Sequence, residues 1–299
     1  RKGEYIGTVN TAETNEAQLT EMMVGKKVTL NIERSTPHDP ADRLIVRGVD
    51  CISRDGVRLL DDVSFTARSG EILGIAGIAG SGQRELLEAI AGLQPLSGGE
   101  ILYHDPKSGD TEDLRNKTPM QIRELGVRLS FVPEDRLGMG LVGNMDIVDN
   151  MMLRSYRKGK SVFVDRQPPR QLADRIIEDL GVVTPGPSTP VRRLSGGNVQ
   201  KVLVGREIAS APTVLMAAYP VRGLDINSSY LIYNLLNQQK ENGVAVIFVG
   251  EDLDVLMALC DRILVLGGGR ITGEVDGRTT TKEEIGLLMT RTKGGNARG

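Results

Sequence analysis

The sequence predicts an α/β fold built on a parallel β-sheet, and three stretches support that prediction. The apolar run EILGIAG at 71–77 is typical of a buried strand, and it leads through a glycine-rich loop into the helical pattern QRELLEAIAGL at 83–93. Two further apolar runs, TVLMAA at 213–218 and VAVIFVG at 244–250, suit buried parallel strands. The helical stretch SSYLIYNLLNQQKEN at 228–242 separates them, so strands and helices alternate as they do around parallel sheets.

The composition favours a protein that does not act on nucleic acid. The 299 residues carry a formal charge of -2, and the basic side chains are scattered among acids without a long basic run. The two cysteines, Cys51 and Cys260, are too few for a disulfide framework, so we expect buried free thiols in a reducing cytosol. No apolar run approaches the roughly 18 residues of a membrane helix, and any membrane association is expected to go through a partner.

Residues 1–28 are expected to be the tail of a preceding domain. Slid over the end of the chain without gaps, they place Gly3 on Gly269 and Met23 on Met289, and both stretches are typical of a short strand followed by an amphipathic helix. We interpret the match as an internal repeat, which predicts a tandem protein. Chance agreement between two strand–helix segments is the alternative.

The rest of the chain divides into a linker, a domain and a tail. Residues 29–42 hold two prolines and no apolar periodicity, which predicts a linker. A complete second domain is expected at 43–291, where LIVRGV and VRLLDDVSFTA are typical of strands, and a flexible tail at 292–299. The stretch at about 114–194 is polar, interrupted by prolines and mostly helical in pattern, so it is expected to be a lobe inserted into the α/β core.

The loop GIAGSGQR at 77–84 has the glycine spacing of a phosphate-binding loop without its last two side chains. Such loops read GxxxxGKS or GxxxxGKT, and here Gln83 and Arg84 follow the second glycine. Backbone N–H groups can still cradle phosphates, so the loop either holds a nucleotide through its backbone or makes only a tight strand-to-helix turn. The candidate residues are Gly77, Gly80, Ser81, Gly82, Gln83 and Arg84.

Two stretches further along the chain predict an anion site and a turn; with the glycine loop they are the three landmarks of this sequence. The stretch LSGGNVQK starts a helix with a good N-cap, and its glycines let a ligand approach the free N–H groups closely. The stretch PVRGLD at 220–225 follows an apolar strand and ends on Asp225. The candidate anion-site residues are Leu194, Ser195, Gly196, Gly197 and Asn198.

Together and in this order, the three landmarks resemble the nucleotide-binding domain of ABC transporters over about residues 43–291. The resemblance implies a P-loop ABC-type α/β fold with an antiparallel β subdomain and an inserted helical lobe. The stretches GIAGSGQREL, FVPEDR, TPGPSTPVRRLSGGN and PVRGLD are similar to the second nucleotide-binding domain of tandem ATP-binding subunits of bacterial importers for nucleosides and simple sugars. We favour the nucleoside branch, because AAYP replaces the usual acidic pair and TPGP precedes the signature; the simple-sugar branch is the alternative.

The resemblance implies catalytic roles that this chain leaves unfilled. Gln83 replaces the lysine that pairs with the β and γ phosphates, and Arg84 replaces the hydroxyl residue that ligates Mg²⁺, so no metal is expected in this site. Ala218 and Tyr219 stand at the aspartate and glutamate places, which removes the group that polarises the attacking water. Glu251 stands at the place of the switch histidine, where a carboxylate would repel the γ phosphate.

Other family positions imply contacts with the nucleotide base and with neighbouring domains. Residues 29–64 lack an aromatic side chain, so the ring that stacks on adenine is absent. Glu134 holds the glutamine place of the loop that reports to the membrane subunit. Asp225 resembles the aspartate of the interdomain loop, and it is equally suited to cap the following helix.

The sequence thus predicts the degenerate half of an importer motor. This half would donate its signature helix to the ATP site of an intact N-terminal nucleotide-binding domain of the same polypeptide, bind ATP or ADP weakly if at all, and lack appreciable hydrolysis by itself. Membrane permease subunits, and indirectly an extracellular solute-binding protein, are the other expected partners, at the cytoplasmic face of the cell membrane. A weakly active homodimeric ATPase and a soluble non-transport ABC protein are the alternatives.

Overall fold

The computed structural model describes residues 4–15, 18–19, 21–22, 32–37, 39–125, 127–153 and 165–291. The chain divides into two units, Arg1–Glu33 and Arg34–Gly299. No helix within the described residues is both long and apolar enough to cross a bilayer. The flexible tail expected at 292–299 falls outside the described residues, so it stays a prediction.

The first unit forms less regular structure than the repeat predicts. Residues 4–10 form neither strand nor helix, whereas the four described residues 18–19 and 21–22 are helical. A strand needs a neighbour to satisfy its N–H and C=O groups, and the described part of this unit contains no second strand. No strand is formed within the described residues 4–10.

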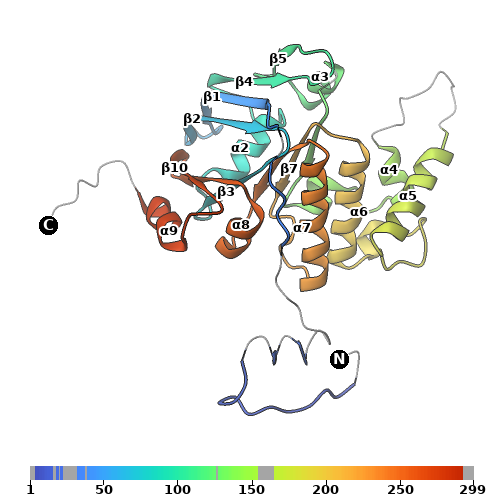
Figure 1. Cartoon of the computed structure of the whole chain (residues 1–299). Coiled ribbons are helices and arrows are strands. Elements are labelled where there is room, and N and C mark those ends of the chain that lie inside the picture. Colours follow the sequence, from blue (N-terminus) through green and yellow to red (C-terminus); the bar gives the residue numbers. More distant parts are fainter. Residues whose placement is uncertain are drawn as a thin grey trace. The chain divides into compact units, whose positions relative to one another are not determined.

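The second unit contains two sheets, as the fold class requires (Figure 1). The smaller sheet is antiparallel with strand order β2-β1-β4-β5. The larger sheet has the order β10-β9-β3-β8-β7-β6, in which all neighbours are parallel except the β10–β9 pair. The strands are β1 (Asp42–Ile52), β2 (Arg58–Arg68), β3 (Ile72–Gly77), β4 (Gly98–His104), β5 (Thr111–Asp113), β6 (Leu129–Val132), β7 (Val214–Ala218), β8 (Ala245–Val249), β9 (Arg262–Gly267) and β10 (Arg270–Asp276).

Helices connect the parallel strands of the larger sheet. Two of them, α4 and α5, belong to the long segment between β6 and β7 and lie away from the sheet. In Figure 1, α4 and α5 lie on the far side of α6 from α7. The helices are α2 (Gln83–Ile90), α3 (Pro119–Glu124), α4 (Ile147–Met152), α5 (Gln167–Asp179), α6 (Gly196–Ala209), α7 (Ile226–Glu241), α8 (Leu253–Leu259) and α9 (Lys282–Thr290), with a π-helical turn η1 (Arg136–Gly140) and a 3₁₀ turn η2 (Val191–Arg193).

The start of the inserted lobe expected at about 114–194 is too early. Strand β6 lies inside that range, yet it pairs with β7 along the edge of the larger sheet. Its residues LSFV are short and apolar without a helical period, a pattern that tertiary pairing turns into a strand. The insertion therefore begins after Val132.

The core lies where the expected buried strands meet the smaller sheet. Every residue of β7 and of β8 is buried, which explains their continuous apolar sequence. Leu44 of β1, Leu60 of β2 and Ile75 of β3 belong to one apolar cluster that joins the two sheets. Both cysteines are buried free thiols, as expected.

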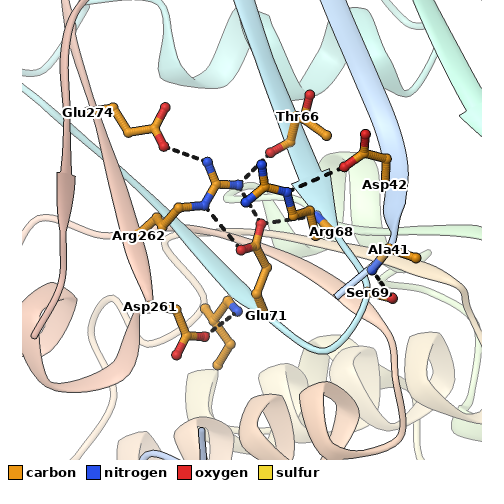
Figure 2. Close-up of polar contacts among 10 residues, drawn as sticks. Ala41, Asp42, Thr66, Arg68, Ser69, Glu71, Asp261, Arg262 and Glu274 are labelled. Atoms are coloured by element: carbon orange, nitrogen blue, oxygen red, sulfur yellow. Dashed lines mark hydrogen bonds and ion pairs between the residues drawn. The ribbon is translucent and has the colours of Figure 1, made fainter. Parts of the chain in front are cut away.

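An ion-pair cluster lies where residues of the two sheets meet (Figure 2). Arg262 at the start of β9 donates to Glu71 Oε1 at 2.5 Å and to Glu274 Oε1 at 2.5 Å, and also to the carbonyl of Thr66. Burial would lower the pKa of Arg262, but its hydrogen bonds and charge pairing with Glu71 and Glu274 outweigh burial and raise it. The guanidinium therefore holds β2, β3, β9 and β10 together as a permanent cation.

Candidate functional site

The glycine loop lies between the carboxyl end of β3 and the start of α2, where the sequence predicts it. Gly82 has φ +102°, and a Cβ there would come within 2.9 Å of Leu60 Cδ2 and 3.0 Å of the Leu59 carbonyl oxygen. Only glycine fits this left-handed, crowded position without strain. The turn between β9 and β10 also contacts the loop, because the Gly269 N–H donates to the Ser81 carbonyl at 3.0 Å.

The Gln83 side chain is turned back into its own loop. It is 2% exposed, and its Nε2 donates to the Ile78 carbonyl at 3.1 Å. A Cβ on Gly77 would lie 2.4 Å from that Nε2, so the side chain packs directly against the first glycine. The amide therefore bonds the loop to itself where a lysine would extend toward phosphate.

Arg84 points along α2. Its Nε donates to Glu88 Oε1 at 2.6 Å, one helical turn further on. That hydrogen bond raises the pKa of Arg84. Arg84 therefore remains a cation paired with a carboxylate of its own helix.

The loops after β6, β7 and β8 bring together three residues that lie far apart in sequence. Glu134 follows β6, Tyr219 follows β7 and Glu251 follows β8, and these strands are neighbours in the sheet. Arg222 lies between the two carboxylates, with Nη1 paired to Glu134 Oε1 and Nη2 at 3.6 Å from Glu251 Oε1. Its guanidinium carbon also lies 5.9 Å from the centre of the Tyr219 ring. The sequence predicts the three positions but not the arginine that joins them.

Tyr219 is held in an uncommon backbone conformation. Its φ is +47°, while its N–H donates to the Val249 carbonyl at 2.9 Å and its carbonyl accepts from the Arg222 N–H at 3.1 Å. Burial raises the pKa of Tyr219, and the charges of Glu134 and Glu251 add to the effect. The phenol therefore stays protonated and does not supply a general base near neutral pH.

The signature residues form the start of α6, as predicted. Ser195 is the N-cap, and its Oγ accepts from the Asn198 N–H at 3.4 Å and from Asn198 Nδ2 at 3.0 Å. Gly196 is exposed, and the first N–H groups of a helix have no intrahelical partner. Leu194, half-buried, precedes the cap. The helix start is thus open to an anion from outside this chain.

Asp225 caps α7. Its Oδ1 accepts from the Ser228 N–H at 3.1 Å, and its Oδ2 accepts from the Ser228 hydroxyl at 2.7 Å. The capping role expected from the sequence is confirmed by these bonds. A Cβ on Gly197 would lie 3.6 Å from Ser228 Oγ, which places the start of α7 against the start of α6.

The comparisons with known proteins identify the family. A family model described as ABC transporter matches residues 60–220, more than half of the chain. The chain belongs to the ABC transporter family.

Several curated ABC import proteins are similar over nearly the whole chain. The chain is 36% identical to a guanosine import ATP-binding protein of Bacillus subtilis, over 100% of the chain and 58% of that protein. It is 38% identical to a glucose import ATP-binding protein of Haloferax volcanii (97% and 52%) and 35% identical to a nucleoside import ATP-binding protein of Lactococcus lactis (99% and 57%). The chain thus spans about half the length of the curated relatives it matches.

Solved ABC structures share the fold. A nucleotide-free ATP-binding cassette covers 85% of the chain with a TM-score of 0.66 at 21% identity. A dimeric bacterial ABC transporter cassette covers 79% with a TM-score of 0.65 at 23% identity. The P-loop ABC-type α/β fold, with its antiparallel sheet and helical parts, is confirmed.

The residues present do not fit a magnesium ion of the ABC type. Arg84, where the resemblance expects the hydroxyl ligand, is a cation paired with Glu88, and Tyr219 stands where the resemblance expects a carboxylate.

Proposed function

We propose that this chain is one half of the ATP-driven motor of a bacterial ABC importer for nucleosides or simple sugars, the half that donates its signature helix to the ATP site of a partner domain. One observation supports the proposal most directly: Gln83 is bonded into its own glycine loop, while the start of α6 is exposed. The two surfaces of an ABC domain therefore differ in this chain, with the signature intact and the loop altered.

The altered loop is proposed to be structural and to lack appreciable ATP hydrolysis. Hydrolysis needs a polarised water and a stabilised leaving phosphate. Tyr219 has a raised pKa, and Glu251 places negative charge near the strand ends. A nucleotide held by the loop backbone would be bound weakly and without Mg²⁺.

The relatives support an importer. Their names include guanosine, nucleoside, glucose, ribose and xylose import. Because the chain covers about half of each, an N-terminal nucleotide-binding domain of the same polypeptide is the proposed partner for the signature helix. Membrane permease subunits, contacted through the Glu134 loop at the cytoplasmic face, and indirectly an extracellular solute-binding protein complete the proposed assembly.

The test uses the full-length tandem subunit and measures phosphate release from ATP. Gly197→Asp puts a carboxylate at the proposed phosphate contact, and we expect hydrolysis to fall by at least about 100-fold, the cost of losing a positioned transition-state donor. Gln83→Ala, in the altered loop, is the matched variant and is expected to change the rate by less than about threefold. Thermal unfolding checks that both variants fold.

Two results would refute the proposal. One is an equal loss of hydrolysis in Gln83→Ala and Gly197→Asp. The other is steady ATP turnover by residues 1–299 alone, at the rate of an intact domain and with a nucleotide-dependent homodimer on gel filtration, which is the behaviour of a homodimeric ATPase.

A further inference from the structure

Arg222 joins the ends of three neighbouring strands. Its guanidinium pairs with Glu134 after β6 and reaches Glu251 after β8, while its own loop follows β7. Glu134 and Glu251 follow the two strands that flank β7, and two carboxylates brought this close repel each other. A planar guanidinium with several donors can satisfy both at once. Arg222 thus offsets the repulsion between Glu134 and Glu251 and holds the two loops that carry them close together.

The backbone of Arg222 makes a second link, this time to the signature helix. Arg136 Nη2 donates to the Arg222 carbonyl, and Arg136 Nη1 lies 3.2 Å from the position of a Cβ on Gly196. Arg136 opens the η1 turn, two residues after Glu134. The segment 134–136 is therefore held to the Arg222 loop by two separate contacts, one of which borders the start of α6.

We propose that Arg222 is a positioning residue that holds the Glu134 loop in one place against the Glu251 loop and the start of the signature helix. This inference rests on the proposed function, because it assigns a regulation to that site. In this half of the motor, ion pairs within the protein hold the Glu134 loop, which is proposed to contact the membrane subunits, to the Arg222 loop. The position of the Glu134 loop therefore depends on the start of α6 and not on a nucleotide in the glycine loop.

Exposure sets the expected size of the effect. The Arg222 side chain is 56% exposed, and single ion pairs at such exposure contribute little to global stability. The predicted consequence is therefore local: the loops open more often while the fold persists. A matched control exists in Arg47, which is 59% exposed and pairs with Glu100 at 3.0 Å on the antiparallel sheet.

The first experiment measures amide hydrogen exchange in the full-length subunit. Arg222→Gln removes both pairs, and we expect exchange in residues 133–140 and 250–252 to accelerate by about threefold or more, while Arg47→Gln leaves both segments unchanged. The exchanged pair Arg222→Glu with Glu134→Arg is expected to restore protection at 133–140 but not at 250–252. Unchanged exchange in both segments of Arg222→Gln would overturn the proposal.

The second experiment measures coupling in the subunit assembled with its permease in vesicles. We expect Arg222→Gln to raise the number of ATP molecules hydrolysed per solute by about twofold or more, and Arg222→Lys, which keeps a cation, to recover part of the loss. An unchanged ratio in Arg222→Gln would overturn the proposal. The two proposals can fail separately. If Gly197→Asp abolishes hydrolysis while Arg222→Gln changes neither amide exchange nor coupling, the inference about Arg222 fails and the proposed function stands. If Gly197→Asp retains hydrolysis, the proposed function itself fails.

Discussion

At the residue scale, the two side chains that follow the second glycine of the loop both have partners inside the protein. The amide of Gln83 bonds to the Ile78 carbonyl, and Arg84 bonds to Glu88, so both side chains are engaged within their own segment. The glycines around them remain necessary for another reason. Gly77 and Gly82 have neighbours too close for a Cβ, so the fold of the loop requires both glycines whatever the loop binds.

Gly82→Ala is expected to destabilise the second unit by about 1–3 kcal/mol, because alanine at a left-handed φ is strained and its Cβ would meet Leu60 Cδ2 at 2.9 Å. Urea unfolding of the chain measures the change. Gly186→Ala is the control: its Cβ would meet nothing within 4 Å, so it is expected to be nearly neutral. Equal midpoints for the two variants would show that the loop tolerates a side chain.

At the element scale, the candidate site residues lie at the N-termini of capped helices or directly after the ends of strands. Ser195 caps α6 and Asp225 caps α7, and both helices start at the same edge of the sheet. Hydrogen bonds from the Ser228 hydroxyl and N–H lower the pKa of Asp225 below its ordinary 3.8. The folded state therefore favours the carboxylate, and the stability that it contributes is present above pH 3.8 and is lost as the pH falls below it.

Asp225→Ala is expected to cost about 1 kcal/mol of stability near neutral pH, the usual effect of removing an N-cap. Asp225→Asn keeps a capping oxygen, so its stability near neutral pH should stay close to that of the unchanged chain. The unchanged chain and the Asp225→Asn variant should differ in stability only at acid pH. Below pH 3.8 the Asp225→Asn variant should lose less stability than the unchanged chain. Unfolding midpoints measured over a pH series test both expectations, and parallel pH curves would contradict the second.

At the scale of the whole molecule, the first residues of the second unit are held against its helices by a buried ion pair and its neighbours. Lys240 on α7 is 2% exposed, and its Nζ donates to Asp261 Oδ1 at 2.8 Å and to the Ser35 carbonyl at 2.5 Å. Arg278 Nη2 donates to the same carbonyl at 3.1 Å. Asp261 also accepts from the Ile72 N–H at 2.9 Å, so the buried Lys240–Asp261 pair connects Ser35 to the strand that carries the glycine loop.

Lys240→Met is expected to lower the free energy of unfolding by about 3 kcal/mol, because Asp261 would remain buried without its main cation. The linker should also become more sensitive to proteolysis at Arg34. The double variant Lys240→Met, Asp261→Asn should recover part of the lost stability, because it also removes the buried carboxylate. The control Lys282→Met removes an exposed ion pair with Asp254 and should cost less than about 0.5 kcal/mol. A loss as small in Lys240→Met as in Lys282→Met would contradict this role of the Lys240–Asp261 pair.

The sequence by itself determined the strands β1, β2, β3, β7 and β8, the glycine loop, the capped start of α6 and the family, because each depends on local pattern and spacing. Buried strands are continuous apolar runs, caps are short polar residues before a helix, and both can be recognised in isolation.

Only the tertiary structure decided that β6 belongs to the larger sheet, that Gln83 turns into its own loop and that Arg222 joins Glu134 to Glu251. These features depend on which strand ends become neighbours and where a flexible side chain finds a partner. Residues 88 positions apart meet through the order of the strands, which no local pattern encodes.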